Sequence, residues 1–247
     1  MTQFNKPVGS GRTIAPLTNV NLTATALVDT QVREESLPGL VCLYGRAGYG
    51  KSSAAYFLTG EYMAYYVAMK SVWTVKHLLT QILSLMGPAQ PGQTISKLMD
   101  QVCESLADSR RPLIIDQADY LVDKGKANIF MDLYEGSMAP ILLIGEEGLS
   151  STLKSRNETV HSRVLHWIEA QPASANDCRL LADLYCPEVV IADDLLDQIN
   201  ATVAGCTRRV AVNVNRIRNI ARPLGWDRVD LARWGERQLI SGEPHRA

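Results

Sequence analysis

The most informative stretch of this chain is Gly45-Arg-Ala-Gly-Tyr-Gly-Lys-Ser52, which matches the pattern GxxxxGK[ST] at every fixed position. It follows a short apolar run, residues 40–44, and precedes a segment with helical character, residues 53–58. Glycines allow consecutive backbone N–H groups to turn inward around phosphate oxygens, and a helix N-terminus adds partial positive charge. The sequence therefore predicts a phosphate-binding loop between a buried strand and a helix.

This loop predicts ATP and Mg²⁺ as cofactors. Lys51 is expected to reach the β- and γ-phosphates, and the Ser52 hydroxyl is expected to bind Mg²⁺. Residues 112–116 read as an apolar strand that ends in Asp116, whose carboxylate would hold Mg²⁺ through water. We expect the nucleotide to contact the loop and the start of the helix, namely Gly45, Arg46, Ala47, Gly48, Tyr49, Gly50, Lys51, Ser52 and Ser53.

Gln117 stands directly after this acidic residue. Many ATPases of this type carry Glu at that position, where it orients and deprotonates the attacking water. An amide positions water through hydrogen bonds but does not accept its proton. The sequence therefore predicts a catalytic site in which hydrolysis is slow or uses another carboxylate, with Asp119, Glu146 and Glu147 as candidates.

Buried strands alternate with helices from the loop onward. Apolar runs recur at residues 63–67, 113–115, 141–144 and, more weakly, 164–168. Between them, apolar residues repeat with the spacing of one helix face, from Val75 to Met86 and then over residues 95–106. This alternation predicts an α/β fold with a parallel sheet.

After Pro172 the pattern indicates helices alone. We expect them over residues 175–185, from Asp193 as an N-cap, from Thr207, and over about residues 229–240. The predicted organisation is an N-terminal extension (1–37), a nucleotide-binding α/β core (38–171) and a small helical lid with a C-terminal tail (172–247).

Composition excludes several classes of protein. Apolar residues make up 46% and charged residues 21%, as in ordinary globular domains, so a mainly disordered chain is excluded. The net charge is −1, so a nucleic-acid partner must bind a local basic patch. No apolar run is long enough for a membrane span, the N-terminus has no apolar signal segment, and the five cysteines form no CxxC pair. These features predict a cytoplasmic protein.

Six segments occur in an order that is more specific than the loop alone. They are GRAGYGKS (45–52), LIIDQADYLVDK (113–124), APILLIGEE (139–147), HSRVLHWIEAQP (161–172), LLADLYCP with IADDLL (180–196), and TRRVAVNVNRIRN (207–219). Together they resemble the phage DNA-transposition protein B (MuB-like) family of AAA+ ATPases, over about residues 18–227. The resemblance implies an AAA+ P-loop NTPase that binds duplex DNA with ATP and little sequence preference. It also implies helical homo-oligomers that select target DNA and activate a transposase in a bacterial host.

The resemblance assigns roles to further residues. Arg163 matches the arginine finger that reaches the γ-phosphate of a neighbouring subunit, with Arg156 as a rival. Arg208 matches the lid arginine called sensor 2, a catalytic and nucleotide-binding residue. Asn19 and Val20 match the segment that packs near adenine.

Lysines at one end of the predicted sheet are the expected DNA contacts: Lys70 after the second strand, Lys76 one turn into the next helix, and Lys124 and Lys126 after the third strand. Contacts from lysines to phosphates give salt-sensitive binding that is independent of sequence. Solvated loop lysines are an equally good interpretation of the same residues. Two alternative functions stay open: a helicase loader with the same core, and a scaffold that binds ATP without hydrolysing it, which Gln117 favours.

Overall fold

The computed structural model describes residues 14–87 and 94–242, so residues 1–13 of the predicted N-terminal extension lie outside the described residues. Contacts divide the chain into two compact units. One unit comprises residues 19–171, and the other combines the residues up to 18 with those from 172 onward. Across the described residues, no helix has both the length and the apolar character needed to cross a bilayer.

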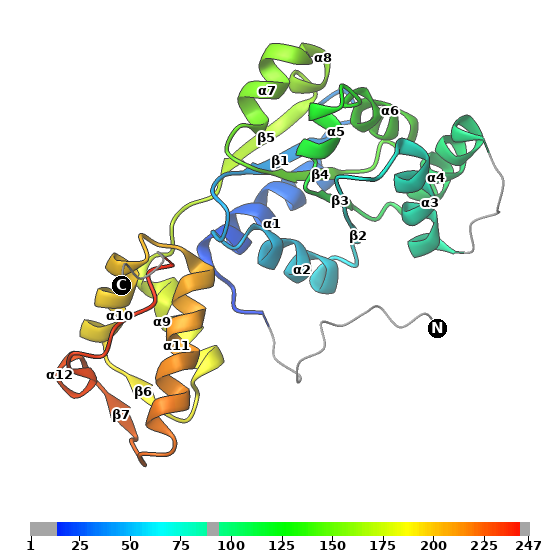
Figure 1. Ribbon diagram of the computed structural model, residues 1–247. Helices are drawn as coiled ribbons and strands as arrows, with labels where there is room; N and C mark the ends of the chain where they lie inside the picture. Colours follow the sequence, from blue (N-terminus) through cyan, green and yellow to red (C-terminus); the bar gives the residue numbers. More distant parts are fainter. Residues whose placement is uncertain (1–13, 88–93, 243–247) are drawn as a thin grey trace. The chain divides into compact units, whose positions relative to one another are not determined.

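A five-stranded parallel sheet forms the centre of the unit 19–171 (Figure 1). Its strands are β1 (Leu40–Tyr44), β2 (Tyr65–Ala68), β3 (Leu113–Asp116), β4 (Ile141–Gly145) and β5 (Val164–Glu169). They lie in the order β2-β3-β4-β1-β5, so the strand that carries the glycine-rich loop is flanked by β4 and β5. Helices connect successive strands, as parallel neighbours require. The predicted α/β fold with a parallel sheet is confirmed.

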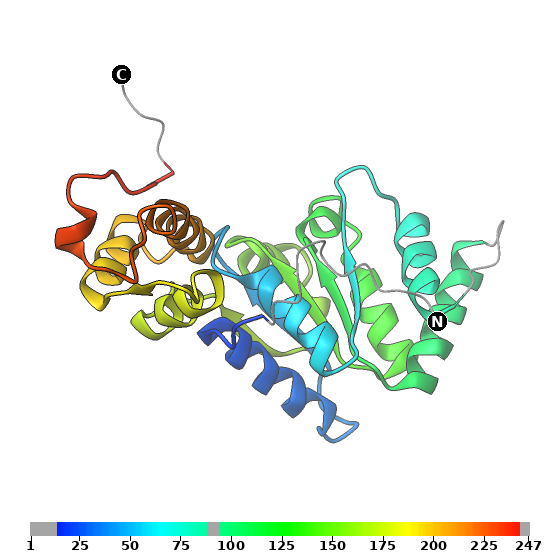
Figure 2. The ribbon, with the colours of Figure 1, turned by 90° about the horizontal axis from the view of Figure 1, so that it is seen from below.

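Helices cover both faces of this sheet. Helices α1 (Thr18–Gln31) and α2 (Lys51–Glu61) lie on one face, which Figure 2 shows from below. The opposite face packs against α3 (Val75–Met86), α4 (Ile95–Ser109), α5 (Asp119–Asp123), α6 (Asn128–Ser137), α7 (Leu149–Arg156) and α8 (Glu158–His161). Alternate strand residues such as Cys42, Val67 and Ile115 point into this second layer and are buried.

Helix α1 forms most of the described part of the predicted N-terminal extension. Its sequence is rich in threonine, yet Val20 and Leu27 are fully buried in the core. Thr23 and Thr30 are buried too, and their hydroxyls donate to backbone carbonyls one turn earlier, at 2.6 and 2.7 Å. Because these polar groups are satisfied within the helix, a polar segment is able to cover an apolar sheet.

The C-terminal unit contains α9 (Ala175–Tyr185), α10 (Asp193–Thr202), α11 (Thr207–Ala221) and α12 (Leu231–Trp234). It also contains a parallel pair of short strands, β6 (Val190–Ile191) and β7 (Arg228–Val229). The prediction of helices alone after Pro172 is therefore wrong. The segments that follow α9 and α11 meet in space, and two-residue strands leave no periodicity to detect in the sequence.

Two helix ends also differ from prediction. The helix expected over residues 229–240 is reduced to α12, because Gly235 turns into the left-handed region at φ 63°. The chain beyond is tied to α11 by Asn213, which accepts from Ile240 N at 2.8 Å and donates to its carbonyl at 3.0 Å. Asp193 is the first residue of α10 rather than its N-cap, which is Ala192, and its carboxylate pairs with Arg179.

Candidate nucleotide-binding site

The glycine-rich loop joins the carboxyl end of β1 to the first turn of α2. Gly50 caps the helix in the left-handed region, at φ 84° and ψ 11°. Gly45 lies at φ 142°, where a Cβ atom would come within 3.0 Å of the Ala170 side chain and 3.2 Å of its backbone nitrogen. Both positions therefore favour glycine, the residue type that a phosphate-binding loop uses to bring its backbone close to a ligand.

Lys51 is buried within this loop, with 8% of its surface exposed. Its ammonium donates to the Gly45 carbonyl and to the Arg46 carbonyl, the latter at 2.9 Å. Burial lowers the pKa of Lys51, and nearby carboxylates, led by that of Glu146, oppose this effect. The lysine thus has two backbone acceptors that phosphate oxygens are able to replace.

Ser52 and Asp116 meet beside the loop. The Ser52 hydroxyl donates to Asp116 Oδ2 at 3.0 Å, and Gln117 N donates to Asp116 Oδ1 at 2.8 Å. Mg²⁺ prefers oxygen ligands and is usually held by one or two carboxylates together with substrate phosphates. A hydroxyl and a carboxylate that converge next to a phosphate-binding loop fit this ion.

Tyr66 is a further member of the site that the sequence analysis missed. Its hydroxyl donates to Asp116 Oδ2 at 3.0 Å. Tyr66 pairs with Ile114 in the β2–β3 register, so it shares a sheet face with Asp116, two residues further along. Burial, reinforced by the Asp116 charge, raises the pKa of Tyr66. No sequence signal could have identified this residue, because periodicity does not reveal that β2 and β3 are neighbours.

The predicted hydrolytic residues lie at the carboxyl ends of β3 and β4. Gln117 is exposed and adopts the left-handed region at φ 58°. Of the rival carboxylates, Asp119 accepts from Glu146 N at 3.0 and 3.2 Å, and burial raises its pKa. Glu147 forms an exposed ion pair with Arg46 at 3.3 Å. The structure thus gathers the amide and the three carboxylates on the loop side of the sheet.

Asn19 joins the loop to the segment that follows β5. Its Nδ2 donates to the Tyr49 and Gln171 carbonyls, both at 2.8 Å, and its Oδ1 accepts from Gln171 N at 2.8 Å. Asn19 is 5% exposed and Val20 is fully buried. Asn19 therefore positions the loop backbone, and the contact of Asn19 and Val20 with adenine stays a prediction.

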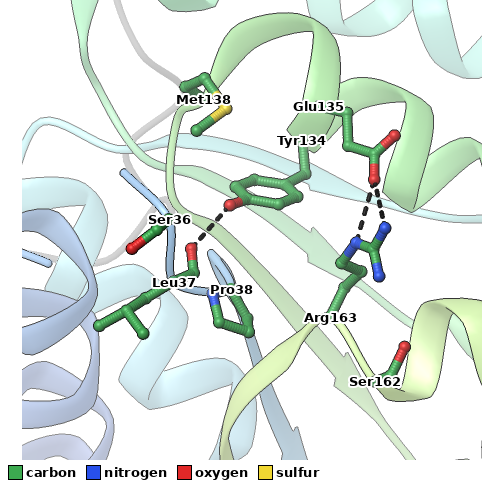
Figure 3. A pocket seen from close by; sticks show the side chains of 8 residues that line it. All are labelled: Ser36, Leu37, Pro38, Tyr134, Glu135, Met138, Ser162 and Arg163. Atoms are coloured by element: carbon green, nitrogen blue, oxygen red, sulfur yellow. Dashed lines mark hydrogen bonds and ion pairs between the residues drawn. The ribbon is translucent and has the colours of Figure 1, made fainter. Parts of the chain in front are cut away.

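Arg163 lies at the amino end of the strands, whereas the loop lies at their carboxyl end. It precedes β5, and its carbonyl accepts from Leu40 N at 3.2 Å, at the amino end of β1. Its Nε and Nη2 both lie 3.0 Å from Glu135 Oε1 of α6, and the two side chains point toward one another in Figure 3. This half-exposed pair borders a pocket of about 310 Å³ lined by Ser36, Leu37, Pro38, Tyr134, Glu135, Met138, Ser162 and Arg163. Arg156, the rival finger, is exposed in the last turn of α7.

Arg208 belongs to the C-terminal unit. It is exposed on the first turn of α11, and the adjacent Arg209 is half-buried. Its role as a lid arginine stays a prediction.

The structure brings two of the four predicted DNA-binding lysines together. Lys124 donates to the Trp73 carbonyl at 3.0 Å and also to the Ser71 carbonyl, and Lys70 Nζ lies 5.6 Å from the centroid of the Trp73 ring. Both lysines are exposed and follow the carboxyl ends of β2 and β3. Lys76 and Lys126 are exposed on α3 and on the α5–α6 loop, respectively.

Comparison with known proteins supports the architecture. A family model described as an AAA domain matches residues 33–153. No curated protein sequence matches this chain.

Solved structures share the fold at low identity. The Aeropyrum pernix ORC2 protein in its ADPNP–ADP complexes has a TM-score of 0.68 and 16% identity, over 89% of this chain and 68% of that chain. The Aeropyrum pernix ORC1 protein in complex with DNA has a TM-score of 0.60 and 20% identity, over 85% and 61%. Domain III of the Thermotoga maritima replication initiation protein DnaA has a TM-score of 0.55 and 15% identity, over 93% and 91%. The chain thus has the AAA+ P-loop NTPase fold, which these structures share.

Proposed function

We propose that this protein is an ATPase that binds ATP with Mg²⁺ and assembles into a homo-oligomer on duplex DNA. The observation that carries the proposal is the 3.0 Å contact between Ser52 Oγ and Asp116 Oδ2, next to the buried Lys51. Lys51 and Ser52 come from the loop and Asp116 from the end of β3. The ammonium group suits phosphate oxygens, and the hydroxyl and carboxylate suit Mg²⁺.

The chain's own residues have the chemistry for nucleotide binding and predict slow hydrolysis. Loop N–H groups and Lys51 would hold the β- and γ-phosphates, and Ser52 and Asp116 would hold Mg²⁺. Mg²⁺, when bound, neutralises charge on the phosphate oxygens. Gln117 would orient the attacking water without accepting its proton, so hydrolysis is expected to be slow. Arg208 is proposed to contact the nucleotide from the lid.

Arg163 supports a role for assembly in this activity. Because it lies at the amino end of the strands, it would serve the loop of a second subunit rather than its own. An arginine finger of this kind stabilises charge on the transferred phosphoryl group and accelerates hydrolysis by about 10³–10⁵-fold. To reach that phosphate, Arg163 must break its ion pair with Glu135. Nucleotide binding in one subunit would thereby be coupled to assembly with the next.

The exposed lysines support duplex DNA as the partner. Lys70 and Lys124 lie together at the same end of the sheet as the nucleotide loop. Contacts to phosphates alone would give binding without sequence preference and with strong salt dependence. One protein of the same fold, the Aeropyrum pernix ORC1 protein, was solved in complex with DNA.

Within this class, the six ordered segments support a role in DNA transposition, as a target selector that activates a transposase. The likeness to replication initiators favours a second candidate, a helicase-loader type of ATPase. A transposition assay with purified transposase separates the two. Stimulation of strand transfer supports the first, and preference for single-stranded DNA with binding to a helicase supports the second.

Electron microscopy of the protein with duplex DNA tests the nucleotide switch. We expect filaments with ATP or a non-hydrolysable analogue and none with ADP. Lys51→Ala and Arg163→Ala should abolish them, whereas Arg156→Ala, which removes the rival finger, should leave them intact. Equal assembly with ADP would contradict the proposal. Phosphate release with and without DNA distinguishes a slow ATPase from a scaffold that never hydrolyses ATP.

A further inference from the structure

Tyr66 lies among the Mg²⁺ residues although it belongs to no motif. Its hydroxyl donates to Asp116 Oδ2, the same oxygen that accepts from Ser52 Oγ, and both distances are 3.0 Å. The other carboxylate oxygen accepts from Gln117 N at 2.8 Å. Donors from β2, from α2 and from the end of β3 therefore fix the orientation of one buried carboxylate.

Of the two donors on Asp116 Oδ2, the tyrosine is the one with no other assigned task. The Ser52 hydroxyl is itself expected to become a metal ligand, which constrains its geometry. Tyr66 instead approaches from the neighbouring strand, and its ring packs against Tyr56 of α2 with the ring centroids 5.1 Å apart. Side chains that orient a metal ligand from outside the coordination sphere commonly change metal affinity by 10–100-fold when they are removed.

We infer that Tyr66 is a positioning residue for Mg²⁺: its hydroxyl holds the Asp116 carboxylate in the orientation that binds the ion beside the nucleotide. This inference rests on the proposed function. The inference goes beyond the proposed function because it assigns Tyr66, on the strand next to β3, an effect on the affinity for Mg²⁺ rather than on the affinity for nucleotide. Removing the hydroxyl should therefore leave binding of the nucleotide alone unchanged.

The test is a Mg²⁺ titration of the full chain with a fluorescent ATP analogue, first in EDTA and then at increasing Mg²⁺. We expect Tyr66→Phe to require about tenfold more Mg²⁺ for half-maximal tightening, with wild-type affinity for the analogue in EDTA. Tyr65→Phe is the matched control, because Tyr65 lies next to Tyr66 on β2 but packs on the opposite face of the sheet, so the Tyr66–Asp116 hydrogen bond stays in place. It should stay within about twofold of wild type. Thermal unfolding of each variant establishes the temperature at which all three are folded.

Each outcome is decisive. An unchanged Mg²⁺ midpoint in Tyr66→Phe would overturn the inference while the proposed function stands. Weaker binding of the analogue in EDTA would mean that Tyr66 supports the loop rather than the metal, and would also overturn it. If the wild-type protein binds no nucleotide under any condition, the proposed function fails, and the inference with it.

Discussion

Asn19 offers a sharp test of how the nucleotide loop is held in place. Its side-chain amide makes three hydrogen bonds at 2.8 Å, two to the Tyr49 and Gln171 carbonyls and one from Gln171 N. Asn19→Ala removes all three bonds and leaves three backbone groups without their partner. The variant should therefore lose stability and loosen the loop at the same time.

The expected loss of stability follows from the surroundings of those groups. A buried polar group left unsatisfied costs about 1–3 kcal/mol. Gln171 is exposed and Tyr49 is half-buried, so water is able to reach part of the vacated site. The low end of the range therefore applies to each group, and we expect Asn19→Ala to lower the free energy of unfolding by about 3 kcal/mol.

Urea denaturation followed by circular dichroism measures this change. Thr25→Ala is the matched control, because Thr25 is exposed on the same helix and should change stability by less than about 0.5 kcal/mol. Asn19→Asp keeps the shape of the side chain but turns its two donors into an anion that faces two carbonyls. We expect it to lose at least about 2 kcal/mol. The reasoning is refuted if the free energies of unfolding of Asn19→Ala and Thr25→Ala differ by less than about 0.5 kcal/mol, the size of effect expected for a surface substitution.

Four further predictions concern the chemistry and partners of the site. Gln117→Glu should raise phosphate release on the order of 10²-fold by supplying a general base, and an unchanged rate would contradict the role given to this position. Burial raises the pKa of Asp119 above its ordinary 3.8, so the folded state binds this proton more tightly than the unfolded state. Ionisation of Asp119 therefore lowers the free energy of unfolding as pH rises from 3.8 through the folded pKa. In urea denaturation, Asp119→Asn should be more stable relative to wild type at pH 7 than at pH 3.5. Glu135→Gln releases Arg163 from a half-exposed ion pair worth less than about 1 kcal/mol, so the melting temperature should barely change. ATP-dependent assembly, measured by light scattering, should begin at a lower protein concentration than in wild type. Lys124→Ala should weaken DNA binding equally for all sequences and reduce the slope of log affinity against log salt by about one, as measured by fluorescence anisotropy. A loss of affinity that depends on the DNA sequence would argue against a phosphate contact.

The features that could be predicted from the sequence are those written in consecutive residues. The loop with Gly45, Gly50 and Lys51 depends on backbone freedom and charge at fixed spacing, so its position after β1 and before α2 was predicted from the pattern. The five strands were also predicted to within a few residues, because strands buried on both faces are continuous apolar runs. Helices such as α3 and α4 were predicted because burial on one face leaves a period in the sequence. Helix α1 left no such period, since its threonines satisfy their own hydroxyls while buried.

What only the tertiary structure decided are the pairings between distant segments. Tyr66 reaches Asp116 because β2 lies next to β3, Asn19 reaches Tyr49 because α1 packs on the same sheet face as α2, and Arg163 meets Glu135 because β5 starts beside α6. Periodicity states which side of an element is buried and carries no information about which element covers it. The order of the strands and the layer taken by each helix are set by packing of the whole core, and that packing gives the predicted site its supporting contacts.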